Sequence, residues 1–270
     1  MDTIVSQTVE SARRLDSLLG DVTLPSLPHV LLEIYDALAS EVAGLDQVVR
    51  LLETDSGLTA RTLRLANSAY YGMPRRISTV AEAILRIGAF DLWWLLFTTE
   101  VKSLFFGIDE RLLDMQLFWS HSLYVACASR RLAERRGAQH PEELFVGGLL
   151  HDVGKLVLVQ RMPVEYGEIL EQVAAGAGPL PELETAGLGF SHAEVGGALL
   201  ARWELPALFE RCASTHHAHP PATPEAEIVA WGNRLAHREL DGEALDLPAL
   251  PQELIDDVNR LYERLVAMIL

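Results

Sequence analysis

The stretch GGLLHDVGK, residues 147–155, decides how the fold is interpreted, because it places polar groups inside an otherwise apolar helical pattern. His151 directly precedes Asp152, and Lys155 follows one helical turn later, among Gly, Leu and Val residues. Adjacent imidazole and carboxylate groups are donors that metal centres use. They are therefore either metal ligands or structural residues held inside a core, and the rest of the chain must distinguish the two.

Apolar residues recur at helical spacing almost everywhere, and no run alternates as a strand does, so the sequence predicts an all-α helical bundle. In the first half, Thr79 and Glu82 form a capping-box pattern before an apolar face, and Asp91 is expected to cap the helix after it. The segment LTARTLRLANSAYYG is predicted to be helical up to Gly72, with Pro74 beyond it.

The second half continues the helical pattern. A helix is predicted to end at Gly137, and another to begin at Pro141 and run through residues 147–155. Residues 174–189 are rich in Gly and Pro and predict a loop, after which Ser191 and Glu194 form a second capping-box pattern. Further helices are predicted near 225–239 and 252–270.

Composition narrows the possible functions. The chain has 270 residues, 49% of them hydrophobic, and a formal net charge of −16, which argues against general binding to nucleic acid. Cys127 and Cys212 lie far apart in apolar patterns, so a disulfide is not expected and a reducing compartment, the cytoplasm, is predicted. The longest apolar run, LWWLLF, is too short to cross a bilayer, and no export signal is recognised.

Histidines occupy inward positions on four predicted helices. They are His121, His151, His192 and His216, with His217 beside the last. A single inward histidine is more often a hydrogen-bonded core residue, but several without partners would each cost about 1–3 kcal/mol. A shared metal centre removes that cost, and imidazole with carboxylate suits Fe, Mn, Zn or Mg. A bound divalent pair would support phosphoester hydrolysis, with Lys155 as the candidate catalytic group near the anion.

The ordered pattern H…HD…H…HH resembles the HD superfamily of metal-dependent phosphohydrolases, including the HD-GYP branch. Six segments resemble the HDOD family more closely, over roughly residues 20–240. They are LPSLPHVLLEIYDAL, LLETDSGLTARTLRLANSAYYG, ISTVAEAILRIGAFDLWWLL, FWSHSLYVA, GGLLHDVGKLVL and HAEVGGALLARWELP. The resemblance implies an amino-terminal helical subdomain, 20–110, packed on an HD-like subdomain, 111–240, with residues 241–270 forming a carboxy-terminal helix.

The HDOD resemblance also implies a function, namely a bacterial output or adaptor module that contacts another protein of a two-component or cyclic-di-GMP pathway, usually without catalysis. The sequence departs from the hydrolases at two places. Asn233 stands where those enzymes carry a final metal-binding Asp, and no Gly-Tyr-Pro motif follows His217. An amide oxygen brings no charge, so Asp152 is left as the single anionic ligand, which favours a weak or mononuclear site, or none, over a dinuclear one.

The sequence therefore favours a non-catalytic signalling module. The alternatives are a metal-dependent phosphohydrolase acting on a cyclic dinucleotide or a nucleotide, and a degenerate pocket that senses a nucleotide or a metal. The candidate metal ligands are His121, His151, Asp152, His192, His216, His217 and Asn233.

Overall fold

The computed structural model describes residues 11, 13–20, 27–40, 44–68, 75–242 and 250–269, and within these ranges it is helical without any strand. The predicted all-α fold is thereby confirmed. Contacts divide the chain into two compact units, residues 25–106 with 263–270 and residues 1–24 with 107–262. The predicted limits of the family domain and of its two subdomains stay predictions.

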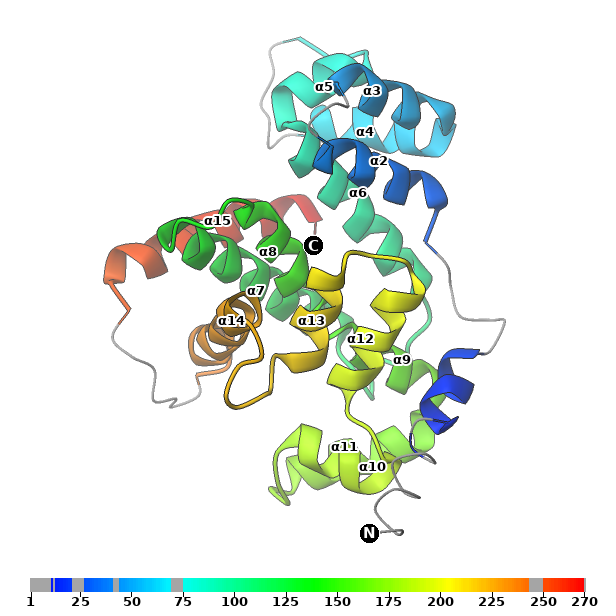
Figure 1. Cartoon of the computed structure of the whole chain (residues 1–270), viewed down its shortest axis with the longest axis vertical. Coiled ribbons are helices and arrows are strands. Elements are labelled where there is room, and N and C mark those ends of the chain that lie inside the picture. The colour runs from blue at the N-terminus through cyan, green and yellow to red at the C-terminus, as the bar shows by residue number, and fades with distance from the viewer. Residues whose placement is uncertain are drawn as a thin grey trace. The chain divides into compact units, whose positions relative to one another are not determined.

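The smaller unit contains five helices among its described residues. They are α2 (His29–Ala39), α3 (Leu45–Thr54), α4 (Ser56–Ala66), α5 (Val80–Ile87) and α6 (Ala89–Leu104) (Figure 1). Their apolar faces meet around α6, where Trp93 and Trp94 are buried. The indole Nε1–H of Trp93 donates to the carbonyl oxygen of Leu31 at 2.7 Å, so the one polar group of this buried side chain is hydrogen-bonded.

The end of α4 differs from the prediction. The helix ends at Ala66, before the predicted stop at Gly72, and residues 69–74 lie outside the described ranges. Asn67 accounts for the early end, because its side-chain amide donates to the carbonyl oxygens of Leu63 and Ile77, and its oxygen accepts the Ile77 N–H. A short polar side chain that binds backbone groups in this way competes with helix continuation.

Two predicted helix caps of the smaller unit are only partly found. The Thr79 hydroxyl accepts the Glu82 N–H, as predicted, but the Glu82 carboxylate accepts the Ser78 N–H instead of closing a capping box. Asp91 does not cap α6, which begins after Gly88; it lies in the first turn and accepts the Trp94 indole N–H. Gly88 has a φ of 95°, which a glycine adopts without strain, so the chain turns there.

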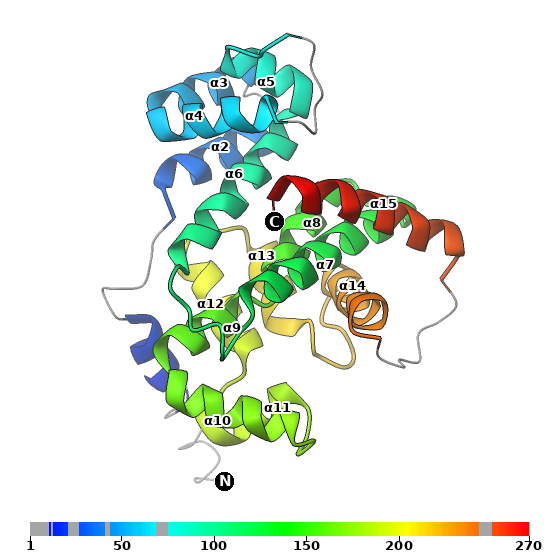
Figure 2. The ribbon, with the colours of Figure 1, turned by 180° about the vertical axis from the view of Figure 1, so that it is seen from behind.

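The larger unit carries most of the remaining helices. They are α7 (Met115–Arg135), α8 (Pro141–Leu150), α9 (Val153–Arg161), α10 (Pro163–Ala174), α11 (Leu180–Leu188), α12 (His192–Arg202), α13 (Ala207–Thr215) and α14 (Pro224–Leu240). Helix α7 packs against α8 and α14, while α12 packs against α9 and α13, as the two opposite views show (Figures 1 and 2). The last helix, α15 (Gln252–Ile269), contacts α7 through the Tyr124 hydroxyl, which donates to Asn259.

Two further predictions for the larger unit are wrong. The helix from Pro141 does not run through residues 147–155, because α8 ends at Leu150 and α9 begins only at Val153. Residues 174–189 are not a continuous loop, since they contain α11, which starts after Pro179 and ends at Gly189 with a left-handed φ of 90°. Gly and Pro in this segment delimit a helix instead of excluding one.

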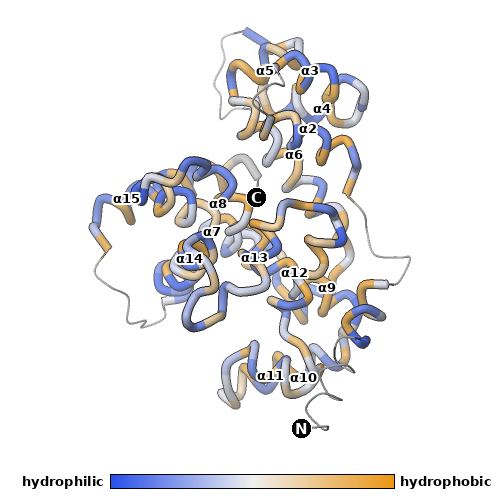
Figure 3. Tube along the Cα trace, viewed as in Figure 1, coloured by the Kyte–Doolittle hydropathy of each residue, from blue (hydrophilic) through white to orange (hydrophobic). Residues whose placement is uncertain are grey.

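Other expectations are confirmed. Ser191 and Glu194 form a complete capping box at the start of α12, and both cysteines are buried without a disulfide. Hydrophobic and hydrophilic residues alternate around the helices instead of gathering in separate segments (Figure 3). Among the described residues, no helix combines the length and the apolar character that a membrane crossing requires.

Candidate metal centre

The break between α8 and α9 places the quoted His-Asp pair at a corner. His151 is the C-cap of α8, and Asp152 is the residue before α9, so the two side chains leave a turn instead of one helix face. Gly154 then lets α9 approach α12 closely, because a Cβ at this position would lie 1.9 Å from the carbonyl oxygen of His192. Only glycine allows this approach, which brings Asp152 to the start of α12.

Asp152 lies at the middle of the cluster. Its Oδ1 is 3.2 Å from Nε2 of His192 and 3.5 Å from Nε2 of His216. Its Oδ2 is 3.3 Å from Nε2 of His151 and 2.6 Å from Nζ of Lys155. The three imidazoles and the carboxylate are buried, and we call them, together with His217, the Asp152 centre.

The far ring nitrogen of each buried histidine is held by another group. Nδ1 of His151 and Nδ1 of His216 each lie 2.7 Å from a backbone carbonyl oxygen, of Gly148 and Ala213 respectively. A carbonyl only accepts, so each Nδ1 carries a proton, and each ring directs its Nε2 at Asp152. Lone pairs facing a carboxylate repel it unless a cation lies between them.

Glu184 binds the Nδ1 side of His192, as the backbone carbonyls do for His151 and His216. The carboxylate of this fully buried residue accepts the Nδ1–H of His192 at 2.6 Å and its backbone N–H at 2.8 Å, and it also accepts the Tyr166 hydroxyl at 2.8 Å. A carboxylate behind a histidine fixes its tautomer and raises its basicity, as in many metal sites. Sequence reasoning missed Glu184 because it assigned residues 174–189 to a loop; Pro at the start and Gly at the end of LPELETAGLG were the available signals.

Buried atoms without hydrogen-bond partners mark the middle of the centre. They are Nε2 of His151, Oδ1 of Asp152 and Nε2 of His216. Buried polar groups in native proteins are nearly always hydrogen-bonded, so unpartnered buried atoms around one carboxylate call for a further partner. Nitrogen and carboxylate donors fit a divalent transition metal, and the Asp152 centre therefore fits the ion that the sequence suggests.

The electrostatics agree with metal ligation. Burial lowers the pKa of His216 to about 4, so its imidazole is neutral near pH 7. Burial by itself raises the pKa of Asp152, but the charges of His151 and Lys155 outweigh it and hold the pKa well below its ordinary value. Burial also lowers the pKa of His192, yet hydrogen bonds to Asp152 and Glu184 raise it above its ordinary value overall.

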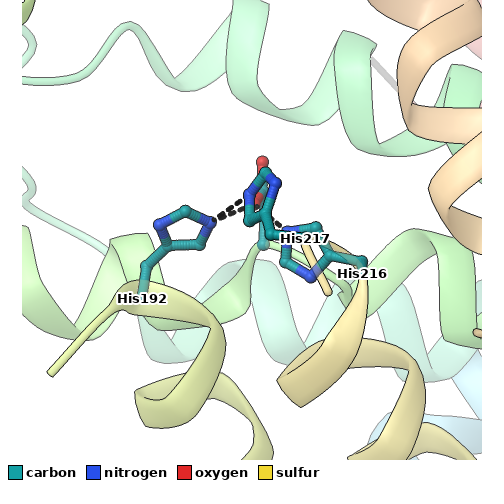
Figure 4. Close-up of side chains that lie close together, drawn as sticks. His192, His216 and His217 are labelled. Carbon is teal, nitrogen blue, oxygen red and sulfur yellow. Dashed lines mark hydrogen bonds and ion pairs between the residues drawn. The ribbon is translucent and has the colours of Figure 1, made fainter. Parts of the chain in front are cut away.

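The remaining candidates divide into two sets. His217 is exposed, but its Nε2 lies 3.1 Å from Nε2 of His192, and Figure 4 shows His192, His216 and His217 gathered together. Asp152, His192, His216 and His217 offer one ligand atom each within 4.8 Å of one another. His121 forms a similar group with His151 and Asp152.

Asn233 pairs with a histidine. Its Oδ1 lies 2.9 Å from Nε2 of His121, so the amide oxygen accepts the imidazole N–H. Burial, reinforced by the charge of His151, lowers the pKa of half-buried His121 to about 3 and keeps this ring neutral. Asn233 therefore orients His121 in this structure and brings no charge to the centre.

Two solved structures resemble the chain over nearly its whole length. An HDOD domain protein with unknown function from Geobacter sulfurreducens shares 28% identity and a TM-score of 0.74, covering 97% of this chain and 93% of that one. A "Putative phosphohydrolase" from Shewanella amazonensis SB2B shares 26% identity and a TM-score of 0.69, covering 96% and 93%.

One curated relative, an uncharacterized protein of Treponema pallidum (strain Nichols), is 30% identical over 245 residues, which cover 89% of this chain and 47% of the relative. The chain thus spans about half the length of that protein. The HDOD domain pattern itself matches residues 24–219, a range that contains helices α2 to α6 and every residue of the Asp152 centre. By this match the chain belongs to the HDOD family.

Proposed function

We propose that the protein is a non-catalytic signal-transduction module of the HDOD type, which acts by contacting another signalling protein and holds one divalent transition metal in the Asp152 centre. The observation that carries the proposal is the pairing of Asn233 with His121, 2.9 Å apart, where a hydrolase would place a second carboxylate. Asp152 is then the one carboxylate among the seven candidate ligands, and two divalent ions would leave a large uncompensated positive charge in a buried site.

The four residues that would hold a single ion are Asp152, His192, His216 and His217. Glu184 would orient His192 from behind, and the carbonyl of Ala213 would orient His216. His151 would remain directed at Asp152 from the other side. Because three of the four ligands are buried, the ion would serve mainly to tie the α8–α9 corner to α12 and to the end of α13.

A metal-dependent phosphohydrolase is the second candidate, and Lys155 favours it. Its Nζ lies 2.6 Å from Asp152 and its side chain is 19% exposed, so an anion arriving from solvent could reach it. When bound, a divalent ion supplies Lewis acidity that polarises a phosphoryl oxygen and lowers the pKa of a water molecule. In this case Lys155 would bind the phosphate and Asp152 would hold the ion.

Metal analysis combined with a phosphodiesterase assay separates the two candidates. Protein purified without chelator should contain at least one transition metal per chain, and the ion of the Asp152 centre should be lost in Asp152→Asn and kept in His140→Gln, whose imidazole lies outside the centre. Hydrolysis of bis-p-nitrophenyl phosphate and of a cyclic dinucleotide should be no faster for the wild type than for Asp152→Asn. Turnover that disappears in both His151→Gln and Asp152→Asn would establish the hydrolase and reject the module.

A further inference from the structure

A second group of donors lies along α14, outside the Asp152 centre. His237 and Asp241 follow Asn233 at intervals of four residues, so the three share one face of the helix. His121 of α7 stands opposite, with its ring centroid 4.7 Å from that of His237. We propose that His121, His237 and Asp241, here called the outer histidine group, form a separate, solvent-accessible site for a divalent transition metal.

The three residues are close enough to share an ion. One ligand atom from each lies within 4.8 Å of the others. A tetrahedral ion with bonds of 2.0–2.1 Å needs ligand atoms about 3.4 Å apart, so modest side-chain rotation is required. The side chains of His237 and Asp241 are 33% and 46% exposed, and the 2.8 Å bond between Nδ1 of His237 and Oδ2 of Asp241 can be exchanged for bonds to the ion.

Asn233 suits this site in a supporting role. Its oxygen accepts the Nε2–H of His121, which leaves Nδ1 of that ring as the nitrogen with a lone pair. Ligating histidines generally donate their other N–H to an oxygen acceptor, which fixes the tautomer and the ring orientation. The amide that cannot replace a charged ligand at the Asp152 centre is thus well placed to orient a ligand of the outer histidine group.

The donor set indicates the class of ion. Two imidazoles and one carboxylate on one side leave the remaining positions to water, as in open Zn²⁺ and Fe²⁺ sites. Hard ions such as Mg²⁺ and Ca²⁺ prefer all-oxygen surroundings and are not expected to compete.

The outer histidine group can be filled together with the Asp152 centre. His121 also belongs to the group with His151 and Asp152, and one imidazole nitrogen cannot serve both sites. The set of Asp152, His192, His216 and His217 does not need His121, however. The ligands present can therefore hold two ions per chain, one in the Asp152 centre and one in the outer histidine group.

The chain offers a matched control for the outer histidine group. His29 and Glu33 on α2 form a His-carboxylate pair with the same four-residue spacing, 3.2 Å apart and well exposed. Within the part of the chain that the structure describes, this pair belongs to no group of three metal-binding residues. A variant of this pair therefore shows how much metal an ordinary histidine-carboxylate pair on a helix binds without a third ligand.

Cobalt and zinc titrations test the proposal on chelator-stripped, full-length protein. Co²⁺ absorption and equilibrium dialysis with Zn²⁺ should give two ions per chain for the wild type and for His29→Gln. His237→Gln and Asp241→Asn should each weaken one ion by at least about 10-fold and retain the other. His217→Gln, at the exposed ligand of the Asp152 centre, should show the opposite pattern. Far-ultraviolet circular dichroism should be the same for all variants.

Two results would overturn the proposal. One is a wild-type stoichiometry of a single ion that His237→Gln and Asp241→Asn retain with unchanged affinity. The other is a second ion whose affinity His29→Gln lowers as much as His237→Gln does, which would show only non-specific binding to histidine-carboxylate pairs. Loss of the Asp152 centre alone, as in His217→Gln, tests the proposed function and leaves the ion of the outer histidine group in place.

Discussion

Asn67 in the smaller unit and Asp152 in the larger one are both polar residues that end or separate helices, but their partners differ. Asn67 makes three hydrogen bonds, all to backbone groups of Leu63 and Ile77. Asp152 accepts a hydrogen bond from Lys155, but Nε2 of His151 and Nε2 of His216, which point at its carboxylate, are buried without hydrogen-bond partners. A satisfied polar residue stabilises the fold by itself, whereas an unsatisfied buried one points to a missing partner.

Replacement of Asn67 should have the largest effect on stability. Asn67→Ala removes three hydrogen bonds and leaves the Ile77 backbone without partners, so we expect the free energy of unfolding to fall by about 3 kcal/mol. Asn67→Asp keeps the acceptor for the Ile77 N–H and should lose less. Urea denaturation measures both, and equal losses for the two variants would contradict the role assigned to the side-chain oxygen that accepts the Ile77 N–H.

Metal bound at the Asp152 centre should raise the free energy of unfolding by nearly as much as Asn67→Ala lowers it. With Zn²⁺ at about 100 times its dissociation constant, the wild type should gain roughly 2.7 kcal/mol of unfolding free energy. Asp152→Asn should lose the part of this gain that comes from the Asp152 centre, because that centre's one anionic ligand is gone, whereas Asn67→Asp should gain as much as the wild type. A gain of the same size in Asp152→Asn would place the ion elsewhere.

Glu184→Gln tests the support behind the ligands. The amide keeps the size of the side chain but loses the charge that holds Nδ1–H of His192, so metal affinity should fall about 10- to 100-fold. Isothermal titration with Zn²⁺ measures this loss. Tyr166→Phe removes one hydrogen bond to the same carboxylate and serves as the control, with a smaller expected loss.

The smallest effect is expected at a satisfied cap close to the Asp152 centre. Ser191 caps α12 and accepts the Glu194 N–H, so Ser191→Ala should cost about 1 kcal/mol in urea denaturation. Zinc affinity should hardly change, because the Glu184 carboxylate still holds His192. A large loss of affinity would show that the cap, and not Glu184, positions the ligand.

Much of the centre could be predicted from the spacing of its residues. His121, His151, His192 and His216 stand out because each interrupts an apolar helical pattern, and Asp152 stands out because it follows His151 directly. Glu184 gave no such signal, because its segment is rich in the Gly and Pro residues that usually mark loops. The outer histidine group escaped for a different reason, since His237 and Asp241 lie on a polar, partly exposed face that predicts nothing unusual.

The sequence by itself determined the all-α fold and the identity of the main candidate ligands, because these follow from local periodicity and residue chemistry. Only the tertiary structure decided that the chain turns at His151 and Asp152, that Glu184 stands behind His192 and that Asn233 pairs with His121. Each of these depends on the close approach of separate helices, such as α9 and α12 at Gly154, and no local pattern records which helices meet.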